Sequence, residues 1–189
     1  MSLSFSPFGI ILAISYLLGV FIFWRWGRRE GFSSNDLFDL ALVSSLVAFG
    51  GGKIPPILLG ASAEFYWAGA VLAGAAALLI SAFFRRWSSL RLMDLGAIAL
   101  SFSEAAAFLG FWILKIQAPL FFAGCAARVV FLYLIHRRTP SGVTFFSYLI
   151  LEGVLLYLSG GFLSIAVLGL GIAGLIAILI KFKVKRSNG

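Results

Sequence analysis

The chain has 189 residues, of which 61% are hydrophobic and 12% are charged, and its mean hydropathy is +1.05. A water-soluble fold of this length cannot bury so much apolar surface, so the composition excludes an ordinary soluble domain. The formal net charge is +8, but the basic residues alternate with apolar segments instead of lining one polar face. This arrangement excludes nucleic acid as the partner.

Twelve of the fifteen basic residues fall into four clusters, which long apolar segments separate. The clusters are Arg25/Arg28/Arg29, Arg85/Arg86/Arg91, Arg137/Arg138 and Lys181/Lys183/Lys185/Arg186. Lys and Arg gather at the cytoplasmic ends of membrane spans, where they meet anionic lipids. Each pair of spans between consecutive clusters is therefore expected to leave the cytoplasm and return to it. The pattern predicts an all-α, polytopic membrane bundle of about seven helices, with the N-terminus outside and the C-terminus in the cytoplasm.

The apolar segments approach the length of about 20 residues that a bilayer core requires. In chain order they are Phe8–Trp24, Leu37–Leu59, Phe65–Phe84, Leu92–Leu114, Leu120–Ile135, Val143–Leu158 and Phe162–Ile180. No linker, repeat or low-complexity segment divides them. Residues 1–189 are therefore expected to form a single transmembrane domain.

The second segment contains Gly50–Pro56, in which three glycines and a lysine precede Ile54 and two prolines. Glycines loosen a helix and prolines remove backbone donors, so this stretch predicts an interrupted span. Freed carbonyls within a membrane must be covered by protein or water, so the stretch is expected to face the interior. A kink that only shapes packing is the alternative.

Ionisable residues inside the spans are candidates for function, because each charge at bilayer depth costs about 2.5 to 3.5 kcal/mol. Lys53, Glu104 and Glu152 lie deepest in the predicted segments. The residues expected nearer the span ends are Arg128, Lys115 and Asp94. Lys53 is expected to meet Glu104 or Glu152 in a structural pair, or to bind a lipid phosphate. The two carboxylates also make acid/base chemistry or a proton relay an alternative, with the same three residues as catalytic candidates.

The chain has one cysteine and one histidine. A single Cys125 excludes an internal disulfide framework and a cysteine-based metal cage. His136 adjoins two arginines at a span end, where an interfacial role is expected ahead of catalysis. We expect no metal site and no cofactor.

Several stretches, in matching order along the chain, correspond to motifs of one enzyme family. Gly51–Pro56 resembles the family's Gly-Gly-Arg-Leu-Gly-Tyr, Tyr66–Gly69 resembles Phe-His-Gly-Gly, and Ala107–Trp112 falls on Gly-Arg-Leu-Gly-Asn-Phe. A basic loop followed by Asp94, and a basic turn with Pro140, also match. The chain thus resembles bacterial prolipoprotein diacylglyceryl transferase, a seven-span enzyme of the inner membrane. That family transfers diacylglyceryl from phosphatidylglycerol to the lipobox cysteine of a preprolipoprotein.

The chain departs from this family at the positions that give it its chemistry. Trp67 stands where the family has histidine, so the imidazole that takes the thiol proton is missing. Phe108 and Phe111 replace an arginine and an asparagine of the signature, and only Lys53 keeps a positive charge at an arginine position. The outer head segment is reduced to Ile113–Ala118.

Three functions are compatible with these observations. The first is a catalytically degenerate relative that binds a membrane phospholipid, such as phosphatidylglycerol, or a membrane protein partner. The residues that the resemblance assigns to lipid binding are Gly51, Gly52, Lys53, Trp67, Phe108 and Gly110. The second is an active, divergent transferase, and the third is a small transporter or transporter component that uses Lys53, Glu104 and Glu152.

Overall fold

The computed structural model describes residues 7–58, 65–116, 119–158 and 164–187. Across these ranges the chain forms seven α-helices and no strand, which confirms the all-helical expectation. The helices are α1 (Pro7–Arg29), α2 (Ser34–Leu58), α3 (Trp67–Phe84), α4 (Ser89–Ile113), α5 (Pro119–His136), α6 (Val143–Leu158) and α7 (Ser164–Ser187). Each predicted apolar segment coincides with one of them.

Within the described residues, five of these helices are long and apolar enough to cross a membrane. They are α1, α2, α4, α5 and α7. The apolar stretches of α3 and α6 are shorter, at Gly69–Phe84 and Val143–Leu155. This composition is that of a membrane-embedded helical bundle.

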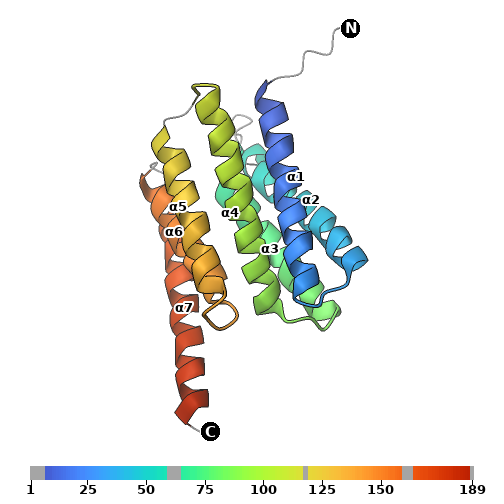
Figure 1. Cartoon of the computed structure of the whole chain (residues 1–189), viewed down its shortest axis with the longest axis vertical. Coiled ribbons are helices and arrows are strands. Elements are labelled where there is room, and N and C mark those ends of the chain that lie inside the picture. The colour runs from blue at the N-terminus through green and yellow to red at the C-terminus, as the bar shows by residue number, and fades with distance from the viewer. Residues whose placement is uncertain (1–6, 59–64, 117–118, 159–163, 188–189) are drawn as a thin grey trace.

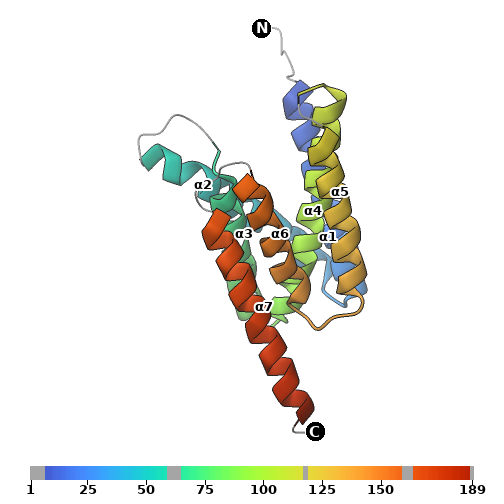
Figure 2. The ribbon, with the colours of Figure 1, turned by 90° about the vertical axis from the view of Figure 1, so that its left-hand side faces the viewer.

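Helix α4 is the centre of the bundle. It packs against α1, α3, α5 and α6, whereas α2 packs mainly on α3 and α7 mainly on α6. One apolar cluster, which includes Leu37 and Leu92, joins α4 to α1, α2 and α3. A second, which includes Ala97 and Leu149, joins α4 to α3, α5, α6 and α7. Figure 2 shows α1, α4 and α5 on one flank and α2, α3 and α7 on the other.

All four basic clusters lie at the same end of the bundle. Figure 1 places the C-terminal ends of α1, α3, α5 and α7 there, while α1 begins at the opposite end. Aromatic rings accompany the charges, since the Arg28 guanidinium lies 5.1 Å from the Trp24 ring and that of Arg137 lies 5.0 Å from the Tyr133 ring. Such a basic, aromatic rim is typical of a membrane–water boundary.

The expected interruption of the second span is wrong, because α2 continues as a helix through Gly50–Pro56. Pro56 has no N–H to donate to the carbonyl of Gly52, four residues earlier. The backbone N–H of Tyr66, just before α3, donates to that carbonyl instead, at 2.8 Å. A neighbouring segment thus satisfies the freed acceptor, as expected for protein-covered backbone at membrane depth.

Candidate functional site

Three charged side chains meet in the interior of the bundle, one from each of α4, α5 and α6. Arg128 is only 4% exposed, and Glu104 and Glu152 are each 6% exposed. One terminal nitrogen of the guanidinium donates to Glu104 Oε2 and the other donates to Glu152 Oε2. We call Arg128, Glu104, Glu152 and the adjoining Tyr148 the buried charge cluster.

Tyr148 completes the buried charge cluster from α6. Its hydroxyl donates to Glu104 Oε1 at 2.9 Å, and its ring lies 5.1 Å from the Arg128 guanidinium carbon. The tyrosine is fully buried, so the hydrogen bond to Glu104 prevents an unsatisfied hydroxyl in an apolar interior. Arg128 also lies 3.9 Å from the sulfur of Cys125, one turn earlier on α5.

This cluster corrects two expectations from the sequence. Arg128 was expected near a span end, but it occupies the middle of α5 and faces the interior. The sequence predicts that Glu104 or Glu152 pairs with Lys53, whereas the ion pairs of both carboxylates are to Arg128. Lys53 is half-buried near the end of α2.

A sequence signal for the position of Arg128 does exist. The buried residues of α5 are Cys125, Arg128 and Leu132, spaced by three and four residues. That spacing places them on one face of a helix. The sequence thus shows that Arg128 shares a helix face with Cys125 and Leu132, and the fold shows that this face is buried and which carboxylates Arg128 meets.

The residues assigned to lipid binding lie in two separate groups. Gly51 and Gly52 face α3 and the segment before it. A Cβ atom added to Gly51 would lie 2.8 Å from the carbonyl oxygen of Gly69. A Cβ atom added to Gly52 would meet the ring of Phe65. Gly110 faces α1, where a Cβ would lie within 2.6 Å of Ile11. These glycines allow close helix approach. The side chain of Trp67 lies outside the described part of the structure.

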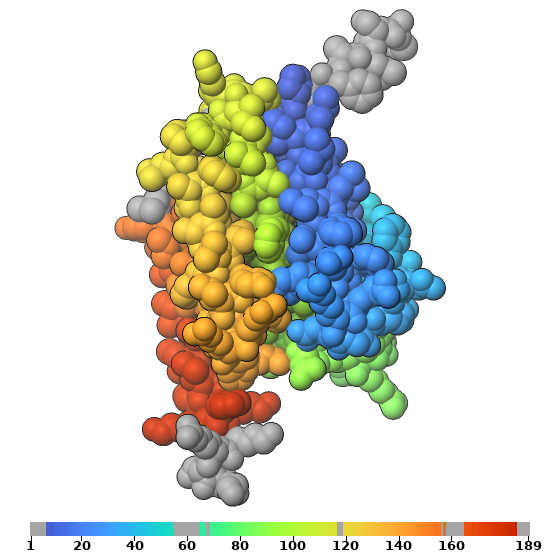
Figure 3. Space-filling model, in the orientation of Figure 1, coloured from blue at the N-terminus to red at the C-terminus, as the bar shows by residue number. Residues whose placement is uncertain are grey.

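Phe108 belongs to a set of stacked rings at the C-terminal half of α4, away from the basic clusters. Phe108 stacks on Phe121 of α5 at 5.9 Å and meets the edge of Phe111 at 6.1 Å. Phe111 in turn stacks on Phe8 of α1 at 5.0 Å. We call these four phenylalanines the aromatic row. It spans the three helices that lie together in Figure 3, where α1 and α5 flank α4.

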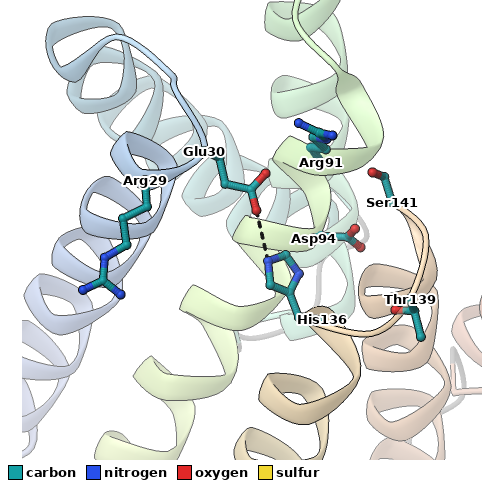
Figure 4. Close-up of a pocket in the computed structure, with 7 residues that line it drawn as sticks. All are labelled: Arg29, Glu30, Arg91, Asp94, His136, Thr139 and Ser141. Atoms are coloured by element: carbon teal, nitrogen blue, oxygen red, sulfur yellow. Dashed lines mark hydrogen bonds and ion pairs between the residues drawn. The ribbon is translucent and has the colours of Figure 1, made fainter.

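A polar cavity of about 420 Å³ opens at the basic end of the bundle. Its lining residues are Arg29, Glu30, Arg91, Asp94, His136, Thr139 and Ser141. Figure 4 shows Glu30 and His136 directed at each other, while the guanidinium of Arg29 points away from them. The Glu30 Oε1 to His136 Nε2 distance is 3.2 Å. His136 thus lies at a helix end, as the sequence indicates.

Asp94 fixes the start of α6 from across the bundle. Its two carboxylate oxygens accept from the backbone N–H groups of Gly142 at 2.6 Å and Phe145 at 2.8 Å. A negative charge at a helix N-terminus satisfies free N–H groups and interacts favourably with the helix dipole. Gly142 has a φ of +98°, which L side chains rarely adopt, so glycine suits this turn. Both carboxylate oxygens of Asp94 are therefore occupied by hydrogen bonds that hold α6, although the residue also lines the cavity.

Within the described ranges, no three His, Cys, Asp or Glu side chains come close enough to hold a metal ion. Neither the polar cavity nor an apolar groove of about 590 Å³ between α1 and α2 includes Glu104 or Glu152 in its lining. Glu104 and Glu152 line neither of these two cavities, and each is only 6% exposed.

No protein-family model matches the chain, and a search of curated proteins gives no match either.

Proposed function

We propose that this chain is a non-catalytic integral membrane protein that binds a membrane phospholipid, and that it is a divergent relative of the prolipoprotein diacylglyceryl transferases. We place it in the bacterial cytoplasmic membrane with its N-terminus outside and its C-terminus inside. The gathering of the basic clusters at one end of the bundle supports this orientation. The five long apolar helices support the membrane setting.

The aromatic row is the observation that carries the proposal. Two of its members, Phe108 and Phe111, occupy the positions at which the resembling family has an arginine and an asparagine. Here those positions are filled by rings that stack on α1 and α5. An arginine at such a site forms bidentate bonds to phosphate, whereas stacked phenyl rings favour apolar acyl chains. In this proposal the phenyl rings keep a contact with the acyl chains of the lipid. The arginine that would bind the lipid phosphate is missing, so the charged group that a transfer reaction needs is lost.

The hydrogen bonds and the burial of Glu104 and Glu152 support a protein without catalytic activity. A general base must come within hydrogen-bond reach of the proton that it removes. Glu104 accepts from both Arg128 and Tyr148, and Glu152 accepts from Arg128. Both are nearly inaccessible, so neither is placed to receive a proton from a substrate thiol.

Native mass spectrometry after mild detergent extraction tests the lipid-binding proposal. The wild-type chain is expected to keep a phospholipid that the Phe108→Ala/Phe121→Ala variant loses. Phe83→Ala/Phe84→Ala is the matched control, because these rings also form a pair but are 78% and 79% exposed on α3. Equal lipid retention by all three proteins would contradict the proposal, and a co-purifying membrane protein would favour a protein partner instead.

Complementation tests the absence of catalysis. The chain is not expected to rescue a strain depleted of its own diacylglyceryl transferase, or to modify a lipobox peptide in phosphatidylglycerol vesicles. Rescue would establish an active, divergent transferase. Glu104 and Lys53 would then be the first residues to substitute.

A transporter is the second candidate, and the buried charge cluster is the observation that favours it. Ionisable groups facing the interior of a membrane bundle often mark a path for ions or protons. Lys53→Ala separates the two candidates. Loss of bound lipid supports the first, whereas loss of solute or ion flux in reconstituted vesicles supports the second.

A further inference from the structure

The apolar groove of about 590 Å³ lies between α1 and α2, away from the buried charge cluster. On α1 its wall includes Leu17, Phe21 and Trp24, at the three- and four-residue spacing of one helix face. On α2 it includes Phe38, which is exposed like Leu17 and Phe21. The volume falls within the range of about 300 to 1,000 Å³ that is typical of sites for a single small ligand. The groove is therefore of a size that suits one lipid molecule.

The groove starts near the basic end of the bundle and extends toward its apolar middle. Helix α1 ends at Arg29 and α2 begins at Ser34, so both helices reach the basic end. The indole N–H of Trp24 donates to the Ser34 hydroxyl at 2.7 Å and joins the two helices there. Leu17 precedes Trp24 by seven residues and so lies about 10 Å deeper along α1. A phospholipid has the same polarity, with its headgroup at the membrane–water boundary and its acyl chains inside.

Among the described residues that line the groove, Asp39 alone is ionisable. Asp39 is exposed, and its carboxylate has no ion pair or hydrogen bond to any part of the chain that the structure describes. By contrast, Asp36, one turn earlier on α2, pairs with Arg85. Asp39 lies about 7.5 Å along the helix from Ser34, among apolar lining residues. A charge at that depth is costly without a counter-charge, so Asp39 favours a cationic group in the groove.

Two further polar groups lie beside Asp39 and Trp24. Asn35 also lines the groove, four residues before Asp39 and so on the same face of α2. Its side-chain amide makes no hydrogen bond within the described ranges, so its oxygen can accept from a ligand. The Arg28 guanidinium stacks on the Trp24 ring at 5.1 Å, which leaves its in-plane N–H groups available to a phosphate. The mouth of the groove thus offers acceptors for an ammonium group and donors for a phosphate.

We propose that this groove binds one zwitterionic phospholipid whose headgroup carries a primary ammonium, as in phosphatidylethanolamine. The ammonium donates to Asp39 and Asn35, Arg28 donates to the phosphate, and an acyl chain lies along the apolar wall. A quaternary ammonium has no N–H to donate, so phosphatidylcholine lacks the charged hydrogen bonds. This site is separate from the aromatic row, which lies toward the opposite end of the bundle, and it does not depend on the lipid-binding proposal made for that row.

Native mass spectrometry of the delipidated full chain tests the site, with titration of phosphatidylethanolamine and phosphatidylcholine that have identical acyl chains. The wild-type chain is expected to bind phosphatidylethanolamine about tenfold more tightly, the effect of one hydrogen bond to a charged group. Asp39→Asn is expected to weaken phosphatidylethanolamine binding about tenfold and to leave phosphatidylcholine binding unchanged. Asp36→Asn is the matched control, because Asp36 lies on the same helix but pairs with Arg85, and it is expected to keep the wild-type preference.

The Phe108→Ala/Phe121→Ala variant is expected to keep the preference for phosphatidylethanolamine, so failure of this site and failure of the aromatic-row proposal give different results. If Asp39→Asn does not fold, the wild-type chain still decides the matter. N-acetylated phosphatidylethanolamine lacks the ammonium group and is expected to bind it no more tightly than phosphatidylcholine does.

Three results overturn the proposal. The first is equal affinity of the wild-type chain for phosphatidylethanolamine and phosphatidylcholine. The second is a full preference for phosphatidylethanolamine in a folded Asp39→Asn variant. The third is a wild-type dimer that Asp39→Asn dissociates, because a second copy of the chain would then occupy the groove.

Discussion

Removal of the Arg128 side chain charge should be the most damaging single change in the interior. Arg128→Met keeps a long, flexible side chain of helix-compatible type but leaves Glu104 and Glu152 without their shared cation. Removing one partner of a buried ion pair costs about 3 to 5 kcal/mol, because the remaining charge stays desolvated. Both acids here are 6% exposed, so solvent does not replace the lost contacts. We expect a loss of unfolding free energy in that range at neutral pH.

The measurement is unfolding of the purified chain in mild detergent by titration with a denaturing detergent, followed by circular dichroism. Arg138→Met is the control, because Arg138 is exposed at the basic end, and surface charges contribute about 0 to 1 kcal/mol. Equal stability of the two variants at neutral pH would refute the assignment of Arg128 as the counter-ion of both acids.

Three further predictions follow from the packing and the orientation. Reporter fusions placed after Arg29, Arg86, Arg138 and the C-terminus should all indicate the cytoplasm, and an external signal from any of them would overturn the topology. Gly171→Ala should cost about 1 to 3 kcal/mol of unfolding free energy, because a Cβ there would lie 2.9 Å from the backbone nitrogen of Ile150. Gly169→Ala on the same helix should be neutral or stabilising, since a Cβ there meets nothing within 4 Å; equal effects would contradict the α6–α7 contact. Tyr148→Phe should cost about 1.5 to 3 kcal/mol in the same unfolding assay, because it removes a hydrogen bond to a charged group, and an unchanged stability would exclude that bond.

The helices could be predicted closely because their signal is local. Predicted span Val143–Leu158 coincides with α6, and predicted span Leu92–Leu114 differs from α4 by three residues at its start and one at its end. Long apolar stretches, bounded by arginines, glycines and prolines, determine these limits without reference to the rest of the fold. The common location of the basic clusters follows from the same alternation.

The contacts between helices could not be predicted in this way. The role of Arg128 depends on carboxylates that lie 24 residues away on either side. The carbonyl of Gly52, which Pro56 leaves without its helical donor, accepts instead from the backbone N–H of Tyr66, which lies outside the helix. In both cases the partner comes from a segment whose distance in space the sequence does not give, so a local rule predicts the need for a partner but not its identity.

The energetics of the buried charge cluster argue against its use as a catalytic base. A positioned general base accelerates a reaction by about 10² to 10⁴, which corresponds to about 3 to 5 kcal/mol of activation free energy. To reach a substrate, Glu104 or Glu152 would have to leave Arg128, and separating a buried ion pair costs about 3 to 5 kcal/mol. The cost of freeing the carboxylate thus cancels the gain from using it.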